Sequence, residues 1–176
     1  MARGDPLAHP EQLLRRVYAY VSYRVGDRTD AEDITSETFE RALRYRSSFD
    51  ARKGDPVAWL LGIARNCVYD SMLRPRTVTL EQEDLGDTGF EEQVVGRLSL
   101  RQALATLADR DRELLALRYG ADLTPRKIGE LLELRPNAVE VALSRARARL
   151  GAALEHLEST GSEGQETLID APDTRL

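Results

Sequence analysis

The sequence has little cysteine and histidine, which excludes most disulfide and metal chemistry. Cys67 is the only cysteine, and His9 and His156 are the only histidines. One cysteine can build neither a disulfide framework nor a cysteine-based zinc site. The sequence also has no glycine-rich phosphate loop, no Gly-x-Ser-x-Gly elbow and no histidine cluster. We therefore expect a protein that is not an enzyme and that holds neither a metal ion nor a cofactor.

Long apolar runs are missing as well. No stretch approaches the roughly 18 to 20 apolar residues that a membrane-spanning helix needs, and the first residues lack the apolar core of a signal peptide. Glycine and β-branched residues are sparse while Arg and Leu are abundant, which favours helices over sheets. The 176 residues, 41% of them hydrophobic, can form one domain or two small ones. We expect an all-α protein that acts in the cytoplasm without membrane insertion.

The net charge of −5 is unevenly distributed along the chain. Residues 81–92 contain six carboxylates and no basic side chain, and residues 155–176 contain six carboxylates and one arginine. The rest of the chain is therefore net positive. Such an asymmetry indicates surfaces that bind a polyanion.

Apolar residues at helical spacing predict a first helical domain at residues 8–76. Its three apolar stripes occupy residues 13–25, 34–43 and 59–68. Thr29 and Glu32 have the spacing of a capping box, so we expect Thr29 to cap the second of these helices. Asp55, followed by a proline, predicts the start of the third.

A second helical domain is predicted at residues 91–158, after a linker at residues 77–90 that lacks periodicity. Asp109 is expected to cap one of its helices. Its last two helices are joined by a short turn at residues 134–136, which is typical of a helix-turn-helix. Residues 159–176 are expected to form a disordered acidic tail. The predicted architecture is two small helical domains joined by a flexible acidic linker.

Basic side chains make the second domain a candidate for binding duplex DNA. A helix that enters the major groove needs arginines and short polar side chains for base edges, and cations for phosphates. The preceding helix begins with cations, where free N–H groups also attract phosphate. An ordinary arginine-rich solvated helix would explain the same pattern without DNA. On the last helix, Arg145, Arg147 and Arg149, with Arg135 at its start, flank Asn137 and Ser144. The candidates are Thr124, Arg126, Lys127, Arg135, Asn137, Ser144, Arg145 and Arg147.

In the first domain, aromatic and basic side chains surround one loop. Aromatic rings that stack on bases beside cations hold single-stranded nucleic acid in many proteins. Alternatively, the two aromatic rings fill the core at a helix end, where we also expect Trp59. The residues of this loop are Tyr45, Arg46, Phe49, Arg52 and Lys53.

Four stretches carry a resemblance to a known family. They are DAEDITSETFERA at 30–42, AWLLGIARN at 58–66, DRELLALRY at 111–119 and SRARARL at 144–150. The first two resemble region 2 of the extracytoplasmic-function (ECF) sigma factors of bacterial RNA polymerase, and the last two resemble region 4. The resemblance covers about residues 13–154, in the family's order and with a linker between the regions.

The resemblance implies a transcription initiation factor that binds core RNA polymerase, directs it to −10 and −35 promoter elements and aids promoter melting. Its partners would be the clamp coiled coil and flap of the polymerase, promoter DNA and, as a further candidate, an anti-sigma factor. The implied polymerase-binding residues are Asp30, Asp33, Glu37 and Arg41. The implied −10 set is Tyr45, Arg46, Ser47, Phe49, Arg52, Lys53, Arg65 and Asn66. The implied −35 set consists of the duplex-binding candidates named above together with Glu140 and Val141.

Two places depart from the family pattern. Residues 140–142 read Glu-Val-Ala where the family usually has Lys or Arg, then Ser, then Arg, and Glu133 occupies the place of a common glycine. Two other functions therefore stay open. One is a stand-alone helix-turn-helix regulator, whose first domain dimerises or binds a ligand. The other is a protein-interaction module, derived from a sigma factor, that has lost DNA binding.

Overall fold

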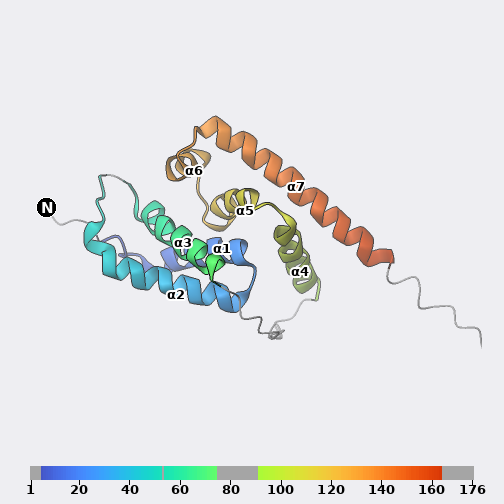
Figure 1. The fold of residues 1–176 in the computed structure, drawn as a ribbon, viewed down its shortest axis with the longest axis horizontal. Coiled ribbons are helices and arrows are strands. Elements are labelled where there is room, and N and C mark those ends of the chain that lie inside the picture. The colour runs from blue at the N-terminus through green and yellow to red at the C-terminus, as the bar shows by residue number, and fades with distance from the viewer. Residues whose placement is uncertain (1–4, 53, 75–90, 164–176) are drawn as a thin grey trace, which may run out of the picture.

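The computed structural model describes residues 5–52, 54–74 and 91–163, and the regular structure within these ranges is entirely helical (Figure 1). The first half contains α1 (Pro10–Val25), α2 (Arg28–Tyr45), the 3-10 turn η1 (Arg46–Ser48) and α3 (Pro56–Leu73). The second half contains α4 (Glu91–Thr106), α5 (Asp109–Leu115), the π-helical turn η2 (Ala116–Gly120), α6 (Pro125–Leu132) and α7 (Pro136–Glu163). This confirms the predicted all-α class.

Parts of the predicted domain division fall outside the residues that the structure describes. The linker predicted at residues 77–90 lies outside the described residues, as does most of the predicted tail. α7 continues past the predicted domain end at residue 158 and reaches Glu163. Across the described ranges, the structure has no helix with the length and apolar character needed to cross a bilayer.

Side-chain caps set the starts of the helices in the first half. Asp27 caps α2, because its Oδ1 accepts a hydrogen bond from the backbone N–H of Asp30 at 2.9 Å. The predicted cap, Thr29, therefore lies inside α2, which begins one residue before it. Asp55 caps α3 as predicted, with Oδ1 accepting from the backbone N–H of Ala58 at 2.9 Å.

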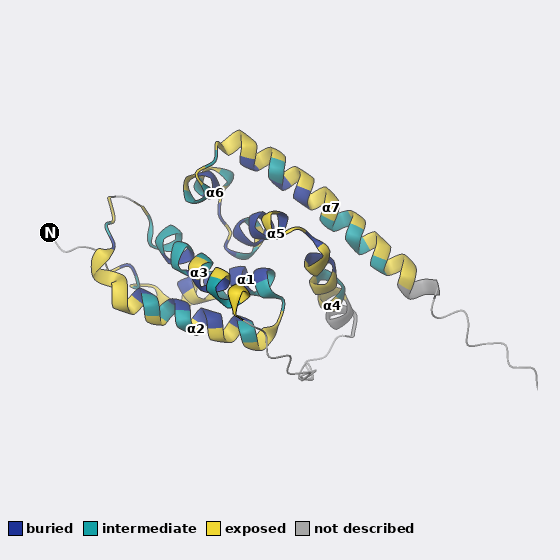
Figure 2. Ribbon diagram, in the orientation of Figure 1, coloured by how far each residue is buried: buried dark blue, intermediate teal, exposed yellow. Residues whose placement is uncertain are grey.

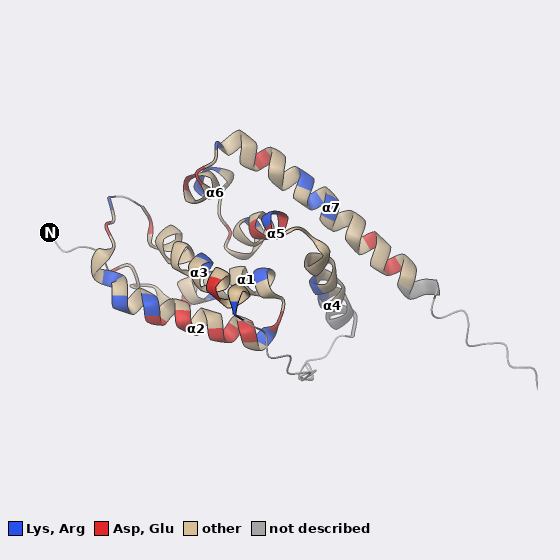
Figure 3. Cartoon of the chain, in the orientation of Figure 1, with Lys and Arg blue, Asp and Glu red and all other residues tan. Residues whose placement is uncertain are grey.

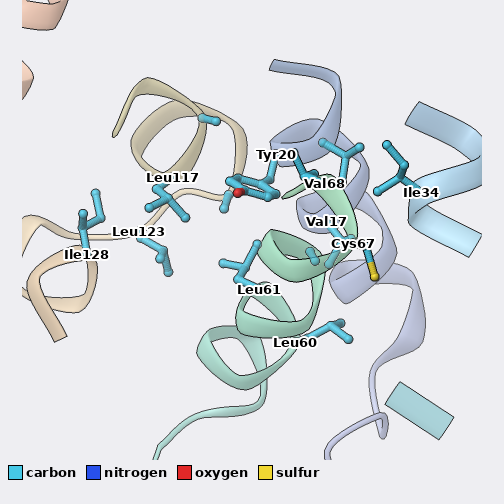
Figure 4. Close-up of a cluster of buried hydrophobic side chains, with 14 of the residues drawn as sticks. Val17, Tyr20, Ile34, Leu60, Leu61, Cys67, Val68, Leu117, Leu123 and Ile128 are labelled. Carbon is cyan, nitrogen blue, oxygen red and sulfur yellow. The ribbon is translucent and has the colours of Figure 1, made fainter. Parts of the chain in front are cut away.

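The two halves share one hydrophobic core. Figure 4 shows Tyr20 of α1 and Leu61 of α3 beside Leu117 and Leu123 of the second half. All four side chains are fully buried. The sequence predicts two small domains without indicating that they pack together. Each half leaves an apolar face uncovered, and burying the two faces against each other is favourable at about 25 cal/mol per Å² of apolar surface.

The backbones of the two halves approach closely at Gly120, the last residue of η2. A Cβ at this position would lie 2.9 Å from backbone atoms of Ala19 and Tyr20 in α1. Real Cβ atoms do not approach backbone so closely, so any other residue would push α1 and η2 apart. Gly120 is therefore required by the contact between the halves.

α6, α7 and the turn between them form the predicted helix-turn-helix. Glu133 ends α6 in the left-handed conformation, with φ 57° and ψ 41°. The backbone N–H of Leu134 then donates to the carbonyl of Gly129 at 2.8 Å. This turn needs a left-handed residue, a conformation that glycine adopts at little cost and that a residue with a side chain, such as Glu133, adopts less readily.

We expect Glu133→Gly to raise the free energy of unfolding by about 0.5–1 kcal/mol, because a side chain in the left-handed conformation costs roughly 1–2 kcal/mol while glycine adds entropy to the unfolded chain. Urea denaturation followed by circular dichroism measures the change. The matched control is Glu130→Gly in the interior of α6, which should lower stability by about 1 kcal/mol. Equal destabilisation by both variants would contradict the role given to this turn.

Candidate nucleic-acid and protein interfaces

α2 presents a mixed-charge face next to the last turns of α3 (Figure 3). Arg41 bonds Glu37 in the same helix at 2.5 Å and Asp70 of α3 at 2.9 Å. The hydrogen bonds that Arg41 donates, first to Asp70 and then to Glu37, raise the pKa of Arg41 above its usual value. Arg41 is thus held in one orientation at the surface, beside the exposed Asp33 one turn before Glu37.

Exposed apolar side chains adjoin this charged face. Tyr69, Met72 and Leu73 of α3 are 63%, 44% and 67% exposed. Arg74 links the end of α3 to α2, with 3.8 Å between its guanidinium and Glu37. Aromatic and methionine side chains are enriched at protein interfaces.

We call this combined patch the α2–α3 surface. Its members are Asp33, Glu37, Arg41, Tyr69, Met72 and Leu73. The three residues from α3 were not predicted from the sequence, because they look like a continuation of the buried stripe at residues 59–68. The signal that could have identified them is that the apolar residues after Val68 no longer follow one face of the helix.

The loop after α2 separates the two aromatic residues that were predicted to stack on bases. Tyr45 is 52% exposed, whereas Phe49 is only 5% exposed. The Phe49 ring packs on Trp59 with 5.5 Å between ring centroids. The extended backbone that follows η1 turns Phe49 inward. Phe49 is thus a core residue, and the predicted stacking role passes to Tyr45 alone.

The other residues of the predicted −10 set do not all lie on one surface. Arg46, Ser47 and Arg52 are exposed around the loop, while Lys53 lies outside the described residues. Asn66 is exposed on α3. Arg65 points to the second half instead, where its Nε donates to Glu113 Oε1 at 2.7 Å.

The predicted −35 residues lie on the outer side of the helix-turn-helix. Figure 2 shows that α7 is largely exposed on the side away from the core. Val139, Leu143 and Ala146 are buried and hold the helix in place. The exposed members of the predicted set are Thr124, Arg126, Arg135, Asn137, Glu140, Val141, Ser144, Arg145 and Arg147.

The arginines on and next to α7 differ in whether they form an ion pair within the protein. Arg135, Arg145 and Arg147 form no ion pair within the part of the chain that the structure describes. Arg149, by contrast, bonds the buried Asp111 of α5 at 2.7 Å and thereby fastens α7 to α5. Arg145 and Arg147 on α7, together with Arg135 just before its first residue, are therefore the charges best placed to meet a polyanion.

Side chains at the start of α6 already form bonds within the protein. Thr124 caps the helix by accepting from the backbone N–H of Lys127 at 3.3 Å. Arg126 pairs with Glu130 on the same helix at 3.2 Å. The Lys127 Nζ donates to a carboxylate oxygen of Asp55 in the first half.

An ion pair between a buried arginine and an exposed aspartate also joins the halves. Arg24 of α1 is 5% exposed and bonds Asp109 through both terminal nitrogens, at 2.7 and 3.2 Å. Burial disfavours the charged guanidinium, but the bonds to Asp109 outweigh burial, so the pKa of Arg24 is raised. The same bonds lower the pKa of Asp109. The predicted helix cap at Asp109 is wrong, because α5 is preceded by Ala108 and the Asp109 carboxylate serves this pair.

Comparison with known proteins shows the family to which this chain belongs. Residues 11–77 match the model of sigma-70 region 2, and residues 97–150 match that of sigma-70 region 4. The ECF RNA polymerase sigma factor ShbA of Streptomyces griseus is 31% identical over 173 residues, which is 88% of this chain and 88% of ShbA. The chain belongs to the ECF sigma factors of the sigma-70 family. Members of this family direct RNA polymerase to promoters and are not enzymes, which confirms the predicted function.

Two further comparisons place this sigma factor among its relatives. The ECF RNA polymerase sigma factor BldN of Streptomyces coelicolor is 34% identical over 145 residues, which is 77% of this chain but only 55% of BldN. The solved structure of RpoE from Bartonella quintana, in complex with the anti-sigma factor NepR, has a TM-score of 0.61 at 21% identity and covers 81% of this chain and 92% of RpoE. That likeness supports the fold.

Proposed function

We propose that this sigma factor contacts core RNA polymerase through the α2–α3 surface, holds the −10 strand at the loop after α2 and reads the −35 duplex with α7. The observation that carries the proposal is that Arg145 and Arg147 are exposed on α7 and form no ion pair with the residues that the structure describes, within the match to region 4. A helix-turn-helix reads base edges from such a helix in the major groove.

The α2–α3 surface suits a helical protein partner. Its charges lie beside exposed aromatic and aliphatic side chains, and interfaces commonly combine apolar anchors with a polar rim. We assign the clamp coiled coil of the polymerase to this surface and the polymerase flap to the second half. Asp30, from the original polymerase-binding set, lies one turn before Asp33 on α2 and is kept in this assignment.

We assign capture of the unpaired −10 strand to Tyr45, with Arg46, Ser47 and Arg52 beside it. Stacking on an aromatic ring contributes roughly 1–3 kcal/mol per base. Holding bases out of the duplex is how the protein would aid melting. Asn66 and Lys53 complete the proposed −10 set, as does Arg65 once it is released from Glu113.

We assign the −35 element to the outer face of α7. Asn137, Val141 and Ser144 lie at helical spacing on this face and are short enough to approach base edges. Arg135, Arg145 and Arg147 supply cations for phosphates or guanine. Thr124, Arg126 and Lys127 place the start of α6 near the DNA backbone.

An anti-sigma factor is the third partner we propose, supported by the complex of RpoE with NepR, whose fold this chain shares. We place the action of the protein in the cytoplasm, because its proposed polymerase and DNA partners are found there. An anti-sigma factor would have to cover the α2–α3 surface or the α7 face to prevent initiation.

A gel shift on promoter duplexes with and without core polymerase tests the proposal. We expect a sequence-specific complex only when core polymerase is present. A stable complex without polymerase, on a palindromic site, would instead support a stand-alone regulator. A complex with neither DNA nor polymerase would support an interaction module that has lost both activities.

We expect Glu140→Lys to raise the affinity for duplex DNA of any sequence. Glu140 is exposed on α7, and a carboxylate there repels nearby phosphates. The new cation should steepen the dependence of affinity on salt by about one counterion. If Glu140 accepts a hydrogen bond from cytosine, the variant should also lose about 1–3 kcal/mol of discrimination at one base pair.

Salt titrations on −35 duplexes that differ by one base pair measure both effects. Glu158→Lys is the matched control, since Glu158 is also exposed on α7 but lies near its far end. If Glu140→Lys matched this control in both slope and sequence preference, Glu140 would not face DNA.

A further inference from the structure

α7 presents three exposed side chains directly opposite its core-facing residues. Asn137, Val141 and Ser144 are exposed at positions i, i+4 and i+7, so they lie on one face of the helix, and we call them the exposed row. Val139 and Ala146 are fully buried on the opposite side and fix the rotation of α7. Because the fold sets this rotation, the exposed row is the part of α7 that reaches furthest into the major groove in the proposed complex.

Val141 differs from the other members of the exposed row because it is apolar. It is 51% exposed, and no other large apolar side chain of α7 is as exposed among the residues that the structure describes. Leu143, two positions later, is only 6% exposed and belongs to the core. A β-branched side chain on an exposed helical face adds nothing to the core and slightly lowers helix propensity. The fold therefore gives no reason for a valine at this position.

Thymine has the chemistry to bind such a side chain. Its C5-methyl group is the apolar group that base pairs present in the major groove, and apolar side chains distinguish thymine by contact with it. Asn137 and Ser144, on either side of Val141 in the exposed row, are short, so neither holds the helix away from the base edges.

Glu140, the neighbour of Val141, has no cation within reach on its own helix. The residues one turn before and after it, at positions 136, 137, 143 and 144, include no basic side chain. Glu130 of α6, by contrast, pairs with Arg126 on the same helix at 3.2 Å. In the part of the chain that the structure describes, Glu140 forms no ion pair. A carboxylate in the major groove accepts a hydrogen bond from the N4 amino group of cytosine.

We propose that Glu140 and Val141 determine which −35 element α7 binds, with Glu140 accepting from the N4 amino group of a cytosine and Val141 contacting the C5-methyl group of a thymine. The −35 element then contains a C·G pair and a T·A pair where these two side chains reach the groove. The sequence departs from the family pattern at both positions, so this preference belongs to the chain itself. The inference rests on the proposed function.

Deoxyuridine tests the thymine contact, because it lacks only the C5-methyl group of thymidine. The holoenzyme first selects −35 elements from promoter fragments in which this region is randomised, and each selected T·A pair is then rebuilt with deoxyuridine. At one pair, we expect this replacement to weaken binding by the wild-type holoenzyme about three- to fivefold, as expected for one buried methyl group. Fluorescence anisotropy of labelled fragments measures binding. Val141→Ala should bind both fragments equally, whereas Val141→Thr, which keeps a methyl group, should still distinguish them.

Glu140→Gln tests the cytosine contact in the same fragments. The amide keeps the length of the side chain but donates as well as accepts, which suits adenine rather than cytosine. We expect the preference at one base pair to change from C·G to A·T by about tenfold. Glu158→Gln makes the same change near the far end of α7, and Leu98→Ala removes a 48% exposed apolar side chain from α4. Both controls should keep the wild-type preferences.

The assignment of Val141 is overturned if the wild-type holoenzyme binds thymidine and deoxyuridine fragments equally at every selected pair, or if Val141→Ala still distinguishes them. The assignment of Glu140 is overturned if Glu140→Gln keeps the wild-type preference. A selected −35 element with unchanged preferences in both variants would reject the inference and leave the proposed function intact. Failure of the holoenzyme to select any −35 element would reject the proposed function, and this inference with it.

Discussion

The double substitution Asp33→Lys with Tyr69→Ala is expected to weaken binding of core RNA polymerase on the order of 100-fold. Exposed tyrosines at the centre of an interface contribute about 2 kcal/mol or more, and reversal of a neighbouring charge adds about 1 kcal/mol. Tyr69 is 63% exposed and Asp33 is exposed, so neither change should disturb the core. Biolayer interferometry with immobilised core polymerase gives the dissociation constant.

The matched control for this double variant is Glu11→Lys with Leu14→Ala on α1. Glu11 is exposed and Leu14 is 50% exposed, so the control makes the same kinds of change away from the α2–α3 surface. It should bind polymerase like wild type. If the two double variants bound equally well, the polymerase would dock elsewhere on the protein.

Tyr45→Ala is expected to reduce promoter opening by a factor of about ten to one hundred while polymerase binding stays unchanged. The expected loss follows from the roughly 1–3 kcal/mol that stacking contributes per base. Tyr45 is 52% exposed, so its removal should cost little stability. Permanganate footprinting of the −10 region in the assembled holoenzyme measures opening.

Phe49→Ala provides the contrast to Tyr45→Ala within the same loop. Because Phe49 is buried against Trp59, its truncation should lower the free energy of unfolding by about 3 kcal/mol or more. Tyr45→Ala should change it by less than about 0.5 kcal/mol. Normal opening with Tyr45→Ala would remove the proposed strand-capture role from this loop.

Local patterns predicted the elements well where one chemical signal dominates. The apolar stripes located α1, α2 and α3, and Asp55 before a proline marked the start of α3. The turn before α7 followed from its short length and its proline. These features depend on residues close in sequence, so spacing alone was enough.

Helix caps were harder to predict where several acceptors stand close together. Thr29 and Asp27 could each cap α2, and only the backbone geometry decides between them. Asp109 has a side chain that could cap a helix, but its carboxylate accepts a hydrogen bond from the buried Arg24, which lies 85 positions away in the sequence. Composition and periodicity carry no information about such a partner.

The packing of the two halves was not predictable for the same reason. Leu117 and Leu123 fit the inner stripe of an independent domain equally well, and nothing in their spacing shows that Tyr20 and Leu61 cover them. Lys127 and Arg65 likewise resemble free DNA-binding cations in the sequence. Only the structure shows that they pair with Asp55 and Glu113 across the two halves.

Run-off transcription with core RNA polymerase on promoter fragments tests the central claim most directly. We expect discrete transcripts that start at a fixed distance downstream of −10 and −35 elements when the sigma factor is added, and none from core polymerase alone. Alanine at both Arg145 and Arg147 should weaken these transcripts and leave polymerase binding intact. Transcripts that are no more specific than those of core polymerase alone would contradict the assignment of this chain as a promoter-directing sigma factor.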